Sequence, residues 1–317
     1  MNDLSWLIIG VLLAVLLPTG AMLVWVERRM LGIWQDRLGP NRVGPFGILQ
    51  SLADLIKILT KHDWIPPFAD RVVFVIAPLI VAATVLVSFA VIPFTPDFVL
   101  SDLNIGLLFI LAMSSLAVYS VVLAGWASNN KYAMLGGMRA AAQTISYEVF
   151  MGISLMGVVI LSGSFNLGQI VEAQRGLWFI VPQFIGFVIF TIAGLAEAHR
   201  LPFDLPEAET ELTAGFHTEY SGMKFALFFL GEYLGLLLIS CLITTLFLGG
   251  WLGPWLPPFL WFVLKTSAVV LFIILIRASL PRPRFDQLLA FGWKVMLPLA
   301  LVNLVATAAL SLDWSNS

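Results

Sequence analysis

The chain has 317 residues, of which 60% are hydrophobic and only 11% charged, and its net charge is −2. A soluble domain carries about 25% charged residues, so this composition excludes an ordinary soluble protein and indicates a membrane protein. We expect a single all-α transmembrane domain over residues 1–317 and no nucleic-acid partner. A cleavable signal peptide is not expected, because residues 1–6 contain no basic segment.

Apolar runs of about 20 residues predict transmembrane helices, because barrel strands would alternate between apolar and polar residues. We expect about eight such helices. They lie near residues 5–26, 72–94, 104–126, 139–162, 178–197, 224–248, 259–277 and 290–311.

The basic residues predict how these helices are oriented. Of the 17 lysines and arginines, 15 lie in loops at about 27–71, 127–139, 198–223 and 278–289, or at the helix ends that border them. By the positive-inside rule these loops face the cytoplasm, and both termini face the periplasm of a bacterial inner membrane. Lys265 lies inside the seventh run, near enough to its outer end to extend its side chain outward.

The first cytoplasmic loop contains a shorter helix of another kind. Residues 39–45 have the composition of a turn. From Phe46 to Leu59 apolar residues recur at helical spacing, and polar residues occupy the other face. This stretch is too short to cross a membrane, so we expect an amphipathic helix in the plane of the interface.

The third cytoplasmic loop is unusually acidic for the side of the membrane that carries the basic residues. It contains six carboxylates, namely Glu197, Asp204, Glu207, Glu209, Glu211 and Glu219. Crowding and burial raise the pKa of carboxylates, so such a cluster can hold protons near neutral pH and pass them on. For Asp204 a helix N-cap, followed by Pro206 and Glu207, is an equally good explanation, but it does not account for the other acids.

Two more carboxylates lie inside predicted membrane helices. Glu148 is nine residues beyond Arg139, roughly 13 Å along a helix and close to the middle of the membrane. Glu232 is eight residues beyond Lys224. Acids inside a membrane are costly and commonly belong to proton relays. A hydrogen-bonded link between helices is the alternative, and it is a stronger one for Glu232 than for Glu148.

The counts of cysteine and histidine exclude several redox centres. An iron–sulfur cluster needs about four cysteine ligands, and this chain has only Cys241. The three histidines, His62, His199 and His217, fall in polar loops. We therefore expect that this chain binds no iron–sulfur cluster, flavin, haem or metal, and that any electron carriers belong to other subunits.

Several motifs, spread over nearly the whole chain, resemble one protein family. They include Glu27-Arg28-Arg29, Arg37 to Gly44, Asp54 to Lys57, Asp63 to Pro66, Arg139 to Glu148, Leu201 to Glu209, Glu219 to Phe225 and Arg277 to Asp286. They are similar to the quinone-chamber membrane subunit, called the H subunit, of the bacterial proton-pumping NADH:quinone oxidoreductase, respiratory complex I. The mitochondrial counterpart is NADH dehydrogenase subunit 1.

This resemblance implies a quinone chamber and a proton path. In the family, the amphipathic helix and the first and sixth spans frame a portal through which quinone enters from the bilayer. The residues that match those lining or bracing the chamber are Glu27, Arg28, Arg29, Arg37 and Asp54. The acidic path would comprise Glu148, Glu197, Asp204, Glu207, Glu209, Glu211, Glu219 and Glu232. For each arginine, membrane anchoring and subunit docking explain its presence as well as a role in the chamber does.

The resemblance also implies a subunit of a proton-translocating NADH:quinone oxidoreductase, with no complete active site in this chain. The substrate would be a quinone, with ubiquinone expected. The partners would be soluble iron–sulfur and quinone-site subunits, small membrane subunits and antiporter-like subunits. His199 receives no role, because several relatives carry other residues there.

Two alternatives remain open from the sequence. One is the sibling subunit of a membrane-bound hydrogenase or formate hydrogenlyase, whose first loop matches residues 39–45 less well. The other is a stand-alone transporter, but the paired, broken helices of two related halves are not visible.

Overall fold

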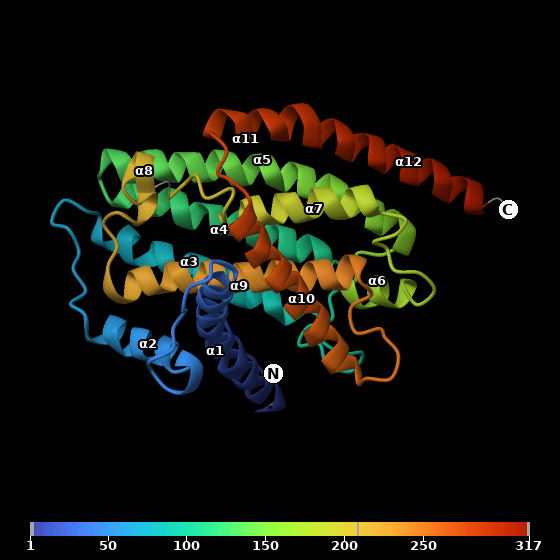
Figure 1. Cartoon of the computed structure of the whole chain (residues 1–317). Helices are drawn as coiled ribbons and strands as arrows, with labels where there is room; N and C mark the ends of the chain where they lie inside the picture. Colours follow the sequence, from blue (N-terminus) through green and yellow to red (C-terminus); the bar gives the residue numbers. More distant parts are fainter. Residues whose placement is uncertain (1–2, 208, 316–317) are drawn as a thin grey trace.

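The computed structural model describes residues 3–207 and 209–315, and it describes side chains for residues 10–207 and 211–312. These residues form helices joined by turns and loops (Figure 1). Within them, β-structure is limited to one isolated bridge between Thr95 and Phe98. Seven of the described helical segments are long and apolar enough to cross a membrane. The predicted all-α membrane fold is therefore confirmed.

These seven segments agree with seven of the eight predicted spans. They are α1 (Asp3–Trp34), α3 (Arg71–Ser88), α4 (Gly106–Ala127), α5 (Lys131–Ser162), α9 (Gly222–Phe247), α10 (Pro258–Ser279), and a C-terminal segment made of α11 (Phe285–Phe291), the π-helical η4 (Gly292–Met296) and α12 (Leu297–Ser315).

The fifth predicted span is shorter than expected. It is α7 (Phe184–Glu197), an apolar helix of 14 residues, whereas the sequence predicted a helix from residue 178. The residues before it form turns, and Pro182 lies just ahead of the helix. A 14-residue helix is roughly 21 Å long, less than the hydrocarbon thickness of a bilayer.

Local side chains explain where two of the long helices begin. Asp70 caps α3, because its Oδ1 accepts hydrogen bonds from the backbone nitrogens of Val72 and Val73. Asn130 caps α5 in the same way through the nitrogen of Tyr132.

The amphipathic helix is present as α2 (Gln50–Thr60), which has no buried residue and leaves Leu52, Ile56 and Leu59 exposed. It begins four residues later than predicted, because Pro45–Gly47 form a 3-10 turn in which Phe46 has a φ of +55°. The Ser51 hydroxyl donates to the carbonyl of Ala21 and ties α2 to α1.

The long helices pack around α5 and α9. The α5 helix packs against α4, α7 and α12, and α9 packs against α3, α10 and α1. Figure 1 shows α3, α5, α7 and α9 running lengthwise through the molecule, with α1 and α10 crossing them obliquely. The shorter elements, η2 (Phe89–Val91), α6 (Leu167–Ala173), α8 (Glu209–Leu212) and η3 (Gly215–His217), lie in the connections.

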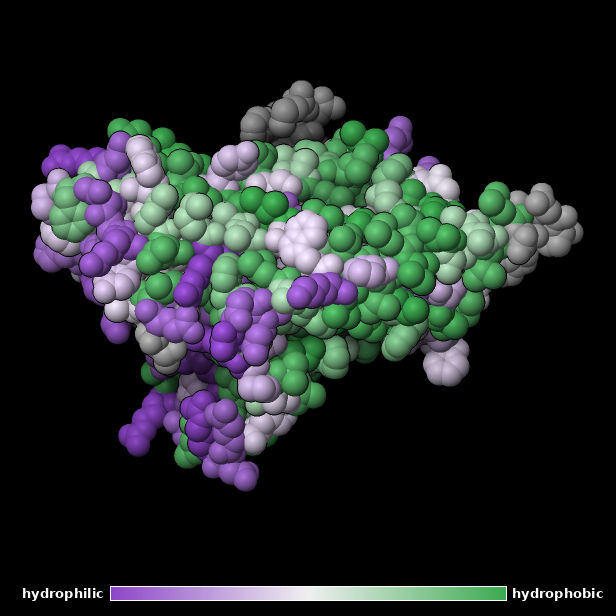
Figure 2. Space-filling view, turned by 90° about the horizontal axis from the view of Figure 1, so that it is seen from above, coloured by the Kyte–Doolittle hydropathy of each residue, from purple (hydrophilic) through white to green (hydrophobic). Residues whose placement is uncertain are grey.

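The loops that were predicted to be cytoplasmic meet at one end of this bundle. Lys224 forms an ion pair with Asp63, Arg139 with Glu211, and Asn130 donates a hydrogen bond to Glu219. Figure 2 shows polar surface gathered toward this end and apolar surface over the opposite half of the face in view. That this end faces the cytoplasm stays a prediction from the basic residues.

Lys265 of α10 extends toward the opposite end, in the expected direction, but it does not reach solvent. The side chain is buried. Its Nζ lies 2.6, 3.1 and 2.6 Å from the carbonyl oxygens of Leu248, Gly250 and Leu252. Lys265 therefore satisfies the backbone of the chain that follows α9.

Candidate functional site

A buried carboxylate near the end of α1 forms the first part of the site. Glu27 is only 3% exposed. Arg277, from the last turn of α10, donates to its Oε1, and Nη1 of Arg200 lies 3.5 Å from its Oε2. Two cations thus offset the charge of one buried acid. We call these three residues the Glu27 cluster; it joins α1, α10 and the loop after α7.

The other predicted chamber residues lie on the outer surface of the same region. Arg28 forms an ion pair of 2.9 Å with Asp54, which also accepts a hydrogen bond from Gln50. Arg28, Arg37 and Gln50 line an open hollow of about 340 Å³. Arg29 is partly exposed. The structure therefore separates Glu27, which faces the bundle, from the surface group around α2.

Asp204 does not cap a helix, so that alternative was wrong. The next helix, α8, begins only at Glu209. The chain turns back instead, and Gly215 packs against the carbonyl of Pro206. A Cβ atom at Gly215, which has a φ of +54°, would lie only 1.8 Å from that carbonyl oxygen. Asp204 accepts a hydrogen bond of 2.9 Å from Arg282. Burial and the neighbouring Glu207 charge raise the pKa of Asp204 to about 7, although Arg282 opposes this.

A buried histidine lies between two of the predicted acids. His217 Nδ1 is 3.2 Å from Oε1 of Glu207, and His217 Nε2 is 4.0 Å from Oε1 of Glu232. Burial disfavours the ionised carboxylate of Glu207, but the hydrogen bond and the charge of His217 outweigh it and hold the pKa of Glu207 below its usual value. The structure thus brings the acidic loop into contact with an acid of α9.

These three side chains also offer ligand atoms within 4.8 Å of one another, a spacing that a metal ion can use. The sequence predicted no metal. The guanidinium of Arg200, with Nη2 3.8 Å from Oε2 of Glu232, opposes a second cation at this position.

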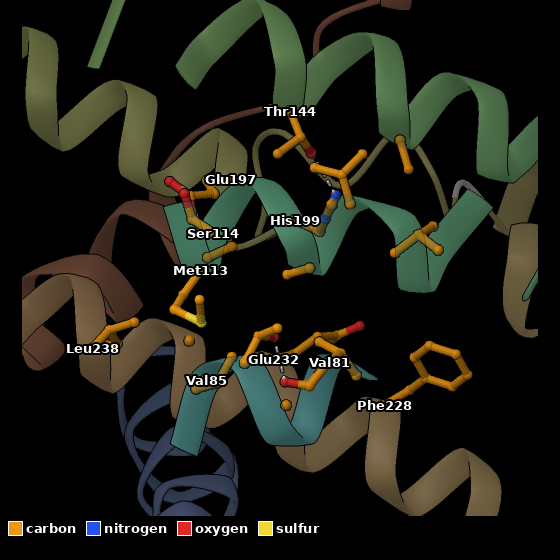
Figure 3. A pocket seen from close by; sticks show the side chains of 18 of the residues that line it. Val81, Val85, Met113, Ser114, Thr144, Glu197, His199, Phe228, Glu232 and Leu238 are labelled. Atoms are coloured by element: carbon orange, nitrogen blue, oxygen red, sulfur yellow. Dashed lines mark hydrogen bonds between the residues drawn. The ribbon is translucent and has the colours of Figure 1, made fainter. Parts of the chain in front are cut away.

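A cavity of about 100 Å³ extends from Glu232 into the bundle, between α3, α4, α5 and α9 (Figure 3). Most of its lining is apolar, but it includes Thr144, Glu197 and His199. His199 Nε2 lies 3.2 Å from the hydroxyl of Thr144. Burial lowers the pKa of His199 to about 4, so its imidazole is neutral at pH 7.

Glu197 and Glu148 meet through a serine of α4. The hydroxyl of Ser114 is 3.4 Å from Oε1 of Glu148, and it also lies beside Glu197, as Figure 3 shows. The hydroxyl of Ser115 is 3.1 Å from Oε2 of Glu148. Glu148 therefore forms hydrogen bonds between helices, and its predicted role in a relay stays a prediction.

The remaining predicted acids lie outside this buried group. Glu211 is exposed and forms an ion pair of 2.7 Å with Arg139. Glu219 accepts a hydrogen bond of 2.7 Å from Asn130. The side chain of Glu209 lies outside the described residues.

Sequence reasoning missed several residues of the site. The pattern of basic residues indicates only on which side of the membrane Arg200 and Arg277 lie, yet both arginines contact Glu27. His217 had a usable signal, since it follows five acids of the same loop. Ser114 and Thr144 had none, because a single hydroxyl in an apolar helix usually bonds to its own backbone.

Comparison with known proteins agrees with the predicted resemblance. The model of the NADH dehydrogenase family matches residues 7–308, a range that includes every site residue described above. The H subunit of the NADH-quinone oxidoreductase of Methylococcus capsulatus is 64% identical over 307 residues, which are 96% of this chain and 97% of that relative. The chain therefore belongs to the NADH dehydrogenase family, as an H subunit of the NADH-quinone oxidoreductase known as complex I.

Proposed function

We propose that this chain forms the entry chamber for a quinone and couples quinone reduction to proton translocation. The proposed substrate is ubiquinone. Electrons reach it from soluble partner subunits that carry the flavin and iron–sulfur centres, and protons pass on toward antiporter-like membrane subunits. The chain acts in a bacterial inner membrane, with both termini in the periplasm, as one subunit of a translocase.

The observation that carries the proposal is a row of protonatable groups leading inward from the acidic loop. Glu207, His217 and Glu232 follow one another at 3.2 and 4.0 Å. The cavity beside Glu232 then reaches Glu197, which meets Glu148 at Ser114. A cavity of about 100 Å³ is large enough for several water molecules, which can complete hydrogen bonds between such groups.

Asp204 lies beside this row, and its protonation responds to the charge of Glu207. Asp204 has a pKa of about 7 because of burial and the Glu207 charge, so a modest change of nearby charge alters its protonation. Reduction of a quinone brings two electrons into the chamber and takes up two protons. If nearby acidic groups supply those protons, they are left with more negative charge. The coupled acids then redistribute their protons.

The chamber is supported by the position of α2. This helix packs against both α1 and α9, which are the first and sixth predicted spans. Its exposed apolar side chains suit a quinone tail or lipid, while Arg28 and Arg37 line the hollow beside it. The head group is held mainly by the soluble partner subunits in this proposal.

The proposal is tested with E148Q and E207Q in the assembled complex. We expect coupled quinone reduction and proton pumping to fall about tenfold, because an amide cannot exchange a proton as a carboxyl group does. E172Q is the matched control, since Glu172 lies outside the row and pairs with the exposed Arg175. Normal pumping in both test variants would rule out the relay.

A second experiment tests the assignment to a complex. Gentle solubilisation of the membrane should release this chain together with flavin and iron–sulfur subunits. A purified chain that reduced quinone alone would contradict the proposal.

A further inference from the structure

We propose that the side chain of Arg200 is a movable positive charge that links the Glu27 cluster to Glu232. This inference rests on the proposed function, since it explains how an event in the chamber reaches the proton path. Arg200 is a positioning residue in this account. Its guanidinium transfers no proton, and its position decides whether the carboxylate of Glu232 is stabilised.

Arg200 lies between two carboxylates that belong to different helices. Its Nη1 is 3.5 Å from Oε2 of Glu27, and its Nη2 is 3.8 Å from Oε2 of Glu232. A guanidinium that is fully bound to a carboxylate has nitrogen–oxygen distances of about 2.7–2.9 Å. Both contacts are longer than this, so Arg200 is shared between the two acids and is fully bound to neither.

The guanidinium is also incompletely hydrogen-bonded although it is buried. Arg200 is 6% exposed, and its Nε and Nη2 have no hydrogen-bond partner among the described residues. An arginine remains charged in a protein interior, so a buried guanidinium gains free energy when it completes a close ion pair. A movement of about 1 Å toward either acid would complete one.

The ring of Tyr233 holds the guanidinium in both positions. The central carbon of the Arg200 guanidinium lies 3.9 Å from the centre of this ring. A cation is attracted to an aromatic face while it lies within about 6 Å of the ring centre, so a shift of about 1 Å is tolerated. A movement between Glu27 and Glu232 therefore keeps this contact.

Arg277 provides the connection to the chamber. It also binds Glu27, and its side chain is 30% exposed, compared with 7% for Arg200. An anion in the chamber, such as a reduced quinone, attracts the more accessible Arg277. Glu27 then draws Arg200 closer, and Glu232 loses its cation and binds a proton. When the anion leaves, Arg200 returns, and Glu232 releases that proton into the cavity beside it.

The other groups that face Glu232 make Arg200 important for its charge. These groups are His217, Glu207 and Asp204. The two carboxylates repel a further negative charge, so they favour neutral Glu232. Arg200 is the permanently charged group that opposes them.

The test is infrared difference spectroscopy of the purified complex upon quinone reduction, which detects the C=O stretch of protonated carboxyl groups. E232Q identifies the band that belongs to Glu232. We expect this band to change on quinone reduction in the wild-type complex, and to change roughly fivefold less in R200Q. R284Q is the control, because Arg284 pairs with the exposed Asp286 and should leave the band unaffected.

An undiminished change of the band in R200Q would overturn the proposal. If R200Q does not assemble, R200K decides, because an ammonium group cannot contact both carboxylates as a guanidinium fork can. The change should then be severalfold smaller, and wild-type amplitude would overturn the proposal. Failure of the proposed function would give a different pattern. No redox-dependent band would disappear in E232Q, and E207Q would pump protons normally. These results would overturn both the proposed function and the role of Arg200.

Discussion

The carboxylate of Glu207 and the buried imidazole of His217 form a close pair, with Oε1 3.2 Å from Nδ1. The two residues are ten positions apart in the acidic loop, and the turn around Gly215 brings them together. The same imidazole faces Glu232 of α9 with its other nitrogen. The pair therefore connects the loop to the membrane helices, and the acids beyond it depend on its geometry.

We predict that H217N lowers coupled quinone reduction about tenfold while the complex still assembles. Without the imidazole, burial of Glu207 is no longer opposed by its hydrogen-bond partner, so the pKa of Glu207 rises. NADH oxidation with quinone and with an artificial electron acceptor measures the effect, and only the quinone reaction should slow. H62N is the control, since His62 is exposed. Equal rates for H217N and wild type would contradict the prediction.

Asp204 predicts a specific dependence on pH. Burial and the Glu207 charge raise its pKa in the folded protein to about 7, from the usual value of 3.8. The stabilisation that accompanies this shift is present at low pH and is lost as the pH rises through 7, because the folded protein then holds an ionised buried acid. Resistance of quinone reductase activity to heat should therefore fall as the pH rises from about 4 to about 7, and it should change little above pH 8.

In D204N this fall should be smaller, since an amide does not ionise. Heat inactivation at a fixed temperature, measured at several pH values, gives the comparison. D286N is the control, because Asp286 is exposed and its pKa lies below the usual value through Arg284. The same pH dependence in D204N and wild type would show that Asp204 does not titrate in this range.

The sequence predicted the long helices well because each is a continuous apolar run, and length in a bilayer is set by its thickness. It failed at α7, where the predicted span from residue 178 included turns that contain Pro182. Those turns are held by tertiary contacts, such as the bond from Gln174 to the carbonyl of Thr245, which no local pattern reveals.

The part of the candidate site that could be predicted from the sequence is the set of charged residues within apolar helices. Carboxylates inside apolar runs stand out, so Glu148 and Glu232 were found. Partners were harder to predict, because Arg200 reaches Glu27 across 173 residues and Arg277 across 250. Only the packed structure shows that these arginines bind acids as well as marking the basic end of the bundle.

Ser114 and Ser115 allow a closely matched test of the connection between Glu148 and Glu197. Both hydroxyls contact Glu148, at 3.4 and 3.1 Å, but only Ser114 is also placed beside Glu197. We predict that S114A lowers the rate of proton pumping severalfold and that S115A has a much smaller effect. The rate of pH change inside membrane vesicles, divided by the rate of quinone reduction, measures the proton pumping of each variant. Equal effects of the two substitutions would mean that contact with Glu148 alone matters.

Lys265 leads to a prediction about stability. Its ammonium group satisfies the carbonyls of Leu248, Gly250 and Leu252, and it lies 4.2 Å from the ring of Trp178. K265M keeps most of the side-chain volume but leaves these carbonyls without their charged donor. The cost should be on the order of 3 kcal/mol or more, because each buried acceptor that loses its partner is penalised.

The half-life of quinone reductase activity at elevated temperature measures this loss, and it should shorten markedly in K265M. The catalytic rate before heating should stay close to that of the wild type, because Lys265 binds the segment after the C-terminal end of α9, whereas the acidic loop precedes the N-terminal end of that helix. K294M is the matched control, since Lys294 is also in a membrane helix but is exposed. If K265M were as heat-resistant as K294M, water would have to satisfy the three carbonyls equally well, and the lysine would not be needed to hold the segment after α9.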